Sequence, residues 1–161
     1  GHLPVMQFLL NNNCPFDEWV CTAAARKGQL EALKWARAHG LPWNKWALIN
    51  AALGGHMAII DWAVQNGAKW RWSLQLITYT AQYGKLEMAK KLRMRGFPVS
   101  ERTCAYAAFG GNLDFLKWLR SGPNPCPWDS DTIKYAEEQG HQHVVRWAID
   151  NGCVWPPHII D

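Results

Sequence analysis

A glycine recurs along this chain at an almost constant interval, and the residues around it recur with it. The interval is 27 or 29 residues, and the marking glycines are Gly28, Gly55, Gly84, Gly111 and Gly140. Gly1 falls in phase with them, and in most segments a second glycine, or Asn13, follows twelve residues after the first. A fixed period of this kind is the signature of a repeat protein, in which one small unit is built several times and stacked. The chain must therefore fold as copies of one unit.

One unit reads as two short helices joined by tight turns. After the marking glycine, apolar residues recur at intervals of three and four, as in Met57, Ile60 and Val64, which predicts a helix. The second glycine suits the end of that helix, because it adopts the left-handed conformation of a helix cap without strain. A second helix is predicted over residues 44–53 and 100–109. Ser100 and Asp129 suit the N-terminal caps of such helices.

Tryptophan also returns to a fixed place in the repeat. Seven residues after the marking glycine stand Trp35, Trp62, Trp118 and Trp147. A large apolar residue that returns to one position indicates a core position, so we expect these indoles to form the spine of a continuous core shared by stacked units. A buried tryptophan removes about 200 Å² from water, and its truncation is expected to cost about 3–5 kcal/mol.

The recurring motif A-A-x-x-G-H/N/Q/K-L-x-x-L-K-W-x-x-x-x-G resembles the second half of an ankyrin repeat. His56 and His141 stand at the family's glycine-histidine position, and the resemblance extends unit by unit over essentially the whole chain. The sequence departs from the family in its period, which is 33 residues in the family, and in lacking the T-P-L-H opening. The missing length falls where ankyrin repeats carry their projecting β-hairpin. This tryptophan-rich variety is similar to divergent ankyrin arrays of large DNA viruses of protists and of some protists, including amoebae, oomycetes and brown algae.

The resemblance implies an all-α fold, a helical-repeat solenoid that is ankyrin-like and has short turns in place of the β-hairpins. The alternative is another solenoid of helical pairs, such as a short tetratricopeptide variant, whose period of 34 fits this spacing less well. We expect residues 1–161 to form a single array with approximate units 1–13 (partial), 14–40, 41–67, 68–96, 97–122, 123–152 and 153–161 (partial). Because a free-standing solenoid needs polar end units, and both ends here are apolar, we expect a longer array or a larger assembly.

Composition argues against several functional classes. The formal net charge of +4 over 161 residues is mild for a nucleic-acid-binding module, so nucleic acid is a possible partner that is not favoured. The longest apolar window, residues 47–64, is interrupted by Gly54, His56 and Asp61, so no membrane span is predicted. The five cysteines are odd in number and form no C-x-x-C pair, which argues against a disulfide framework and a zinc site. We expect an intracellular protein, cytoplasmic or nuclear.

No catalytic constellation stands out in the sequence. Each cysteine occupies a repeat position that carries ordinary hydrophobic residues in other units; Cys21 and Cys104, for example, align with Leu48. His141 and His143 form an H-x-H, but residues two apart on a helix do not face each other. Phosphate-binding, G-x-S-x-G and H-E-x-x-H motifs are absent. We therefore expect a protein that is not an enzyme, with no catalytic residues, no metal site and no cofactor.

The resemblance implies a scaffold that binds another protein through a concave groove, formed by the inner helix and the turns of each unit. If the family register carries over, the groove residues lie just before each marking glycine and near the start of the same helix. These residues are Trp19, Arg26, Lys27, Trp46, Leu53, Gln75, Gln82, Tyr83, Arg102, Phe109, Asp131, Glu138 and Gln139. The set mixes basic, apolar, aromatic and acidic side chains, and it does not identify the partner.

Two other functions stay open at this point. An RNA-associated or assembly-associated structural subunit would use basic residues and exposed tryptophans such as Trp19, Trp46 and Trp72, because single-stranded nucleic acid binds where aromatic and basic side chains alternate. An adaptor would carry its effector domain outside this sequence. Salt-sensitive binding would favour nucleic acid, whereas salt-tolerant binding that depends on Tyr83 and Phe109 would favour the protein scaffold.

Overall fold

The computed structural model describes residues 3–14, 16–42, 44–68 and 73–155, and Trp72 lies outside these ranges. Within them the chain forms eleven α-helices and no strand. The helices are α1 (Leu3–Asn11), α2 (Glu18–Arg26), α3 (Leu30–Ala38), α4 (Lys45–Leu53), α5 (Met57–Gln65), α6 (Ser73–Gln82), α7 (Leu86–Met94), α8 (Glu101–Phe109), α9 (Leu113–Arg120), α10 (Ser130–Glu138) and α11 (Gln142–Asp150). The predicted all-helical repeat fold is confirmed. The helices predicted over 44–53 and 100–109 are α4 and α8, each with its N-terminal cap included.

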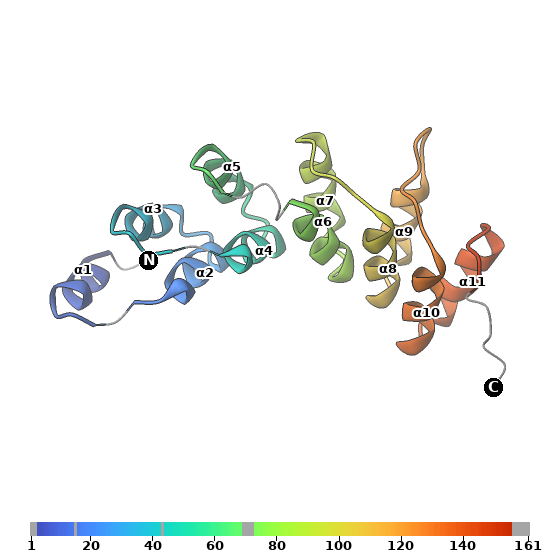
Figure 1. The fold of residues 1–161 in the computed structure, drawn as a ribbon, viewed down its shortest axis with the longest axis horizontal. Coiled ribbons are helices and arrows are strands. Elements are labelled where there is room, and N and C mark those ends of the chain that lie inside the picture. The colour runs from blue at the N-terminus through green and yellow to red at the C-terminus, as the bar shows by residue number, and fades with distance from the viewer. Residues whose placement is uncertain (1–2, 15, 43, 69–72, 156–161) are drawn as a thin grey trace. The chain divides into compact units, whose positions relative to one another are not determined.

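Contacts divide the chain into two compact parts, residues 1–72 and residues 73–161. We call them the first unit and the second unit, and each of them contains several repeat units. In each repeat unit we call the helix before the marking glycine the inner helix and the helix after it the outer helix. In the first unit, the inner helices α2 and α4 pack side by side, and the outer helices α3 and α5 pack on them (Figure 1). In the second unit, α8 packs between α6 and α10, and the outer helices α7, α9 and α11 each pack on the inner helix that precedes them (Figure 1). The single array over residues 1–161 stays a prediction.

Short polar side chains begin the inner helices, and left-handed residues end both kinds of helix. Asn44 accepts hydrogen bonds at its side-chain oxygen from the backbone N–H groups of Trp46 and Ala47, at 2.9 and 3.1 Å. Asp17 and Asp129 occupy the same capping position at α2 and α10. Asn13 ends α1 with a φ of +53°, in the place where the other units carry glycine. Each helix of about nine residues therefore stops where the sequence pattern predicts.

The outer helices contribute to the core the residues four, five and eight positions after each marking glycine, and the inner helices contribute residues such as Leu48 and Ala107. In α9 these are Phe115, Leu116 and Leu119, and all three are buried. At 100° per residue these positions lie together on the side of the outer helix that faces the inner helix. The same geometry buries Ala63 in α5, whereas Val64 is 41% exposed.

The tryptophans do not form the spine of the core, which corrects the sequence prediction. Trp35, Trp62, Trp118 and Trp147 are only half-buried. Position seven lies about 105° around the helix from the centre of the buried stripe, so these indoles cover its edge. The same position carries exposed Lys91 in α7, and in the second unit Trp118 packs against the core with its ring 5.4 Å from that of Phe115.

The cysteines replace ordinary hydrophobic residues, as predicted. Cys21, Cys104, Cys126 and Cys153 are buried, Cys14 is half-buried, and all five are free thiols. Cys126 and Cys153 take the place of buried Leu41 and Phe97 in other units.

Candidate functional site

Successive units are joined by the residue that follows the marking glycine. His56 Nε2 lies 3.2 Å from the backbone oxygen of Arg26, one unit earlier, and His141 Nε2 lies 3.1 Å from that of Phe109. At the same place in the α8–α9 turn, the Asn112 amide donates to the oxygens of Ala81 and Gln82, at 2.8 and 2.9 Å. These bonds satisfy carbonyls at the end of an inner helix, which have no partner within the helix. They also fix the end of each inner helix in place.

The marking glycine is needed for this joint. Gly28 has a φ of +71°, and a Cβ atom built on it would lie 2.6 Å from the imidazole ring of His56. Gly84 and Gly111 are approached in the same way by Asn112 and His141. At Gly28, Gly84 and Gly111 the position therefore combines a left-handed backbone, which glycine adopts without strain, with no room for a side chain. At Gly55 and Gly140 a Cβ atom would meet nothing within 4 Å.

Each inner helix has one side whose residues are exposed or half-buried. On α8 the residues of that face are Arg102, Tyr106 and Phe109, which follow one another by four and three positions and so line one side of the helix. The opposite side, with Cys104, Ala107 and Ala108, is buried. The same three positions on the other helices carry Trp19, Ala23 and Arg26 on α2, Trp46, Asn50 and Leu53 on α4, Gln75, Tyr79 and Gln82 on α6, and Asp131, Tyr135 and Glu138 on α10. We call these residues the inner-helix face of their unit.

The predicted partner-binding residues lie on the inner-helix face or at the end of an inner helix. Exposed among them are Trp19, Arg26, Lys27, Trp46, Tyr83, Arg102, Asp131, Glu138 and Gln139. Half-buried among them are Leu53, Gln75, Gln82 and Phe109. Their role in binding is a prediction that the geometry permits.

A row of tyrosines crosses the inner-helix face of the second unit, and the sequence analysis missed it. The ring centroids of Tyr79 and Tyr106 are 6.3 Å apart, and those of Tyr106 and Tyr135 are 6.2 Å apart. Phe109 joins the row, 6.3 Å from Tyr106 and 6.2 Å from Tyr135. All four side chains are half-buried, so each ring keeps an accessible part. A signal was present in the sequence, because tyrosine stands five residues before the marking glycine in three consecutive units.

The electrostatics of this row keep its first hydroxyl protonated. Partial burial raises the pKa of Tyr79, and the neighbouring Tyr106 and Tyr83 add to the effect, while the Arg102 guanidinium opposes it. At neutral pH the Tyr79 hydroxyl is therefore a hydrogen-bond donor. The charges beside the row differ from helix to helix: α6 contributes none, α8 contributes Arg102, and α10 contributes Asp131 and Glu138.

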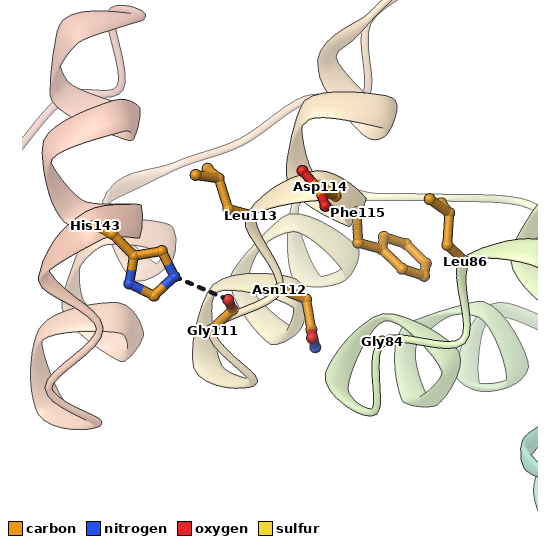
Figure 2. Close-up of a pocket in the computed structure, with 8 residues that line it drawn as sticks. All are labelled: Gly84, Leu86, Gly111, Asn112, Leu113, Asp114, Phe115 and His143. Carbon is orange, nitrogen blue, oxygen red and sulfur yellow. Dashed lines mark hydrogen bonds between the residues drawn. The ribbon is translucent and has the colours of Figure 1, made fainter.

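A hollow of about 510 Å³ lies where the turns of the second unit meet the outer helices, away from this face. Leu86, Leu113 and Phe115 contribute its apolar lining. Figure 2 shows the His143 ring directed at the backbone oxygen of Gly111, at 3.1 Å, and Asn112 pointing toward the turn at Gly84. Asp114 also lines the hollow, whose surface is more polar than apolar. The Asn112 and His143 side chains are occupied by their bonds to the neighbouring repeat unit.

The other groups with a shifted pKa are thiols of the core. The thiols of Cys104 and Cys126 hydrogen-bond each other, and this bond together with burial raises the pKa of Cys104. Burial also raises the pKa of Cys153 to about 11. Among the described residues, no three histidine, cysteine or acidic side chains are grouped so that they could hold a metal ion. Nor does any helix in the described ranges have the length and apolarity needed to cross a membrane.

Residues 20–64, which run from α2 to the end of α5, match the family model for ankyrin repeats. This segment of the chain carries ankyrin repeats. No curated protein sequence matches it significantly. Ankyrin repeats generally serve as protein-interaction scaffolds and are typically non-catalytic. In the described part of the chain, short connections precede the inner helices, as the reduced period predicts.

Proposed function

We propose that this chain is a non-catalytic, intracellular scaffold whose inner-helix face binds a partner protein. The aromatic row of Tyr79, Tyr106, Phe109 and Tyr135 carries the proposal. Its rings keep accessible surface although they stand on packed helices, and rings of this kind supply contact area at little cost in conformational entropy. Aromatic residues are also enriched in protein interfaces.

The rigid support of the face adds to this argument. The bonds from Asn112 to Gln82 and from His141 to Phe109 hold the ends of α6 and α8 in place. A surface that is already ordered loses less entropy on binding than a mobile one. The predicted residues Gln75, Gln82, Tyr83, Arg102, Asp131, Glu138 and Gln139 border the row, and we propose that they determine which partner is accepted.

A capture experiment from a native cell extract tests this function. The full chain is immobilised beside a face variant, Tyr83→Ala, Arg102→Ala and Tyr106→Ala. A matched control, Lys91→Ala, Lys117→Ala and Arg146→Ala, alters exposed residues of the outer helices. Circular dichroism must show the same helicity for all three. We expect a protein that the original and the control retain and the face variant loses. Equal capture by all three would contradict the proposal.

A second candidate function rests on the inner-helix face of the first unit. Trp19 is 59% exposed and Trp46 is 36% exposed at the same position of neighbouring helices, with Arg26 and Lys27 at the end of α2. Exposed indoles beside cations favour stacking with single-stranded RNA. However, the Lys45 ammonium lies 5.3 Å from the Trp46 ring centre and covers part of it. Release of the captured material by nuclease, together with steep salt dependence, would move this alternative to first place.

A further inference from the structure

Two cysteines of the second unit meet in the core although they stand on different elements. Cys104 lies on α8, and Cys126 lies in the connection between α9 and α10, residues 121–129. Their thiols hydrogen-bond each other, and both belong to one cluster of buried residues. The equivalent positions of the first unit also meet, because Cys21 Sγ lies 3.9 Å from the backbone oxygen of Leu41. The repeat therefore brings these two positions together, and in the second unit both of them carry a thiol.

The two thiols differ in their access to solvent. A hollow of about 160 Å³ reaches Cys126, and Ser121, Asn124 and the exposed Arg93 also line it. Cys104 is fully buried and does not belong to that lining. A water molecule takes up about 30 Å³ in the liquid, so the hollow admits a molecule of the size of hydrogen peroxide. Such a molecule meets Cys126 first, with Cys104 behind it.

The electrostatic surroundings favour ionisation of Cys126. The hydrogen bond from Cys104 lowers the pKa of Cys126, and the positive charges of Arg93 and Arg120 act in the same direction. Burial and the Glu101 carboxylate oppose these effects without cancelling them. Because the thiolate is the nucleophile in cysteine chemistry, Cys126 is the member of the pair that reacts first.

The hydrogen bonds of Cys126 keep the two sulfurs in contact. As a thiol, Cys126 accepts from Cys104 and donates to the backbone oxygen of Ser100, at 3.2 Å. Loss of its proton removes the bond to Ser100 and strengthens the bond from Cys104, because the acceptor becomes charged. The Arg120 guanidinium donates to the backbone oxygen of Cys126 and so keeps a positive charge beside this residue. The reactive form is therefore held against a second thiol.

We propose that Cys126 and Cys104 form a peroxide-sensitive thiol pair, in which Cys126 is the site of oxidation and Cys104 is the resolving thiol. The Cys126 thiolate attacks one oxygen of hydrogen peroxide, so that an S–O bond forms and the O–O bond breaks. The other oxygen leaves as hydroxide and takes up a proton to give water. Cys104 then attacks the sulfur of the Cys126 sulfenic acid, which forms the S–S bond and breaks the S–O bond. Hydroxide leaves with the Cys104 proton as a second water.

This reaction oxidises the pair by two electrons and reduces one peroxide. In the resting protein both cysteines are free thiols. Disulfides of intracellular proteins are typically transient and redox-sensing, and reducing thiols of the compartment restore the free form by exchange. The inference does not depend on the proposed scaffold function, because it concerns the core of the repeat and not the inner-helix face.

Peptide mapping of the full chain after oxidation tests the inference. The reduced protein is treated with hydrogen peroxide, the remaining thiols are blocked with iodoacetamide, and trypsin separates the cysteines. The tryptic peptides concerned are 103–117 with Cys104, 121–134 with Cys126, and 147–161 with Cys153. We expect a disulfide between peptides 103–117 and 121–134 that dithiothreitol reverses. The absence of this disulfide, or a disulfide to peptide 147–161 in its place, would overturn the inference.

A variant without the resolving thiol shows which cysteine is oxidised. Cys104→Val places an aliphatic residue where α10 carries buried Ile133, so the core stays filled. A sulfenic acid on Cys126 then lacks the thiol with which it condenses, and dimedone should trap it in peptide 121–134. Cys153→Val is the matched control, and it should form the same disulfide as the original protein. A dimedone adduct spread evenly over the remaining cysteines would contradict the assignment.

Alkylation rates of the reduced protein test the activation of Cys126. Burial raises the pKa of Cys153 to about 11, whereas that of Cys126 is lowered. Iodoacetamide at neutral pH should therefore modify Cys126 at least about tenfold faster than Cys153, after allowance for the weaker nucleophilicity of the more acidic thiol. Arg93→Gln should slow this reaction by about two- to fivefold. Lys91→Gln removes an equal charge from α7 outside the hollow and should leave the rate unchanged.

The outcomes separate a reactive pair from a structural one. Modification of all five cysteines at one rate would show that the reaction proceeds through unfolding, and it would overturn the inference. Reaction of Cys126 no faster than Cys153 would do the same. The capture experiment is carried out under reducing conditions, where both thiols stay free. Loss of the disulfide therefore leaves the scaffold function standing, and failure of capture leaves the thiol pair standing.

Discussion

The side-chain amide of Asn112 donates a hydrogen bond to the backbone oxygen of Gln82, at 2.9 Å, across the boundary between two units. Asn112 lies in the turn before α9, and Gln82 ends α6, thirty residues earlier. This contact links two repeat units at the inner-helix face, because the side chain of Gln82 belongs to that face while its carbonyl accepts from the next repeat unit.

The Asn112 joint should contribute measurably to stability. Asn112→Ala removes the donors to both Ala81 and Gln82. We expect the free energy of unfolding to fall by about 1–3 kcal/mol, because the Gln82 carbonyl loses the amide donor and the Ala81 carbonyl keeps only the Gly84 N–H, at 3.3 Å. Asn112→His restores the residue that other units use and should recover part of the loss. Urea denaturation followed by circular dichroism measures both variants, and an unchanged midpoint for Asn112→Ala would show that water replaces the amide without cost.

The marking glycine should tolerate substitution less well than the glycine that ends the outer helix. Gly28→Ala and Gly40→Ala both place alanine at a positive φ, +71° and +79°, but only Gly28 is approached by a side chain, that of His56. Each variant should lose about 1–2 kcal/mol to backbone strain, and Gly28→Ala a further 1–3 kcal/mol or so from the collision. Thermal or urea unfolding of Gly28→Ala and Gly40→Ala measures the two losses in stability. Equal losses would mean that the His56 ring moves aside freely.

Truncation of a repeat tryptophan should cost less than truncation of a neighbouring aliphatic residue. Leu116 is fully buried, so Leu116→Ala should destabilise the protein by about 2–5 kcal/mol. Trp118 is half-buried at the edge of the same helix, and Lys91 occupies its position in α7. Trp118→Ala should therefore lose roughly half as much. Chemical denaturation measures the free energy of unfolding of both variants. A larger loss for Trp118→Ala than for Leu116→Ala would show that the tryptophan is a central core residue.

Stability should fall in alkaline solution. The pKa of Cys153 rises from 9.0 to about 11 in the folded protein, mainly because of burial. A group whose pKa is raised on folding stabilises the native state fully below its unfolded pKa, and this contribution is lost as pH rises through the folded value. The free energy of unfolding should therefore decline between about pH 9 and pH 11.

Cys21 and Tyr79 act in the same direction, whereas the hydrogen bond between Cys104 and Cys126 lowers the pKa of Cys126, which acts in the opposite direction. Cys153→Val, which keeps an apolar residue in the slot, should make this decline less steep. Urea unfolding at several pH values under reducing conditions measures it. Identical pH profiles for the original and Cys153→Val would contradict the assignment.

Much of the fold was predictable because it depends on local physics. The marking glycines, Asn13 and the caps Ser100 and Asp129 specify where helices begin and end, and these limits follow from backbone geometry that each residue carries with it. The cysteine positions were predictable in the same way, since alignment with Leu48 and Phe97 identifies them as apolar. The predicted groove residues, such as Arg102 and Glu138, do lie on or beside the free side of the inner helices.

Other features depended on which neighbours surround a residue. The sequence alone determined a series of short helical pairs, because period, glycine and capping residues act within one unit. Only the tertiary structure decided that Trp118 covers the edge of the core and that Tyr79, Tyr106 and Tyr135 form a row. The side of a helix that is buried, and the distance between rings on neighbouring helices, are set by how the helices pack against one another, and residues about thirty positions apart along the chain meet only after that packing.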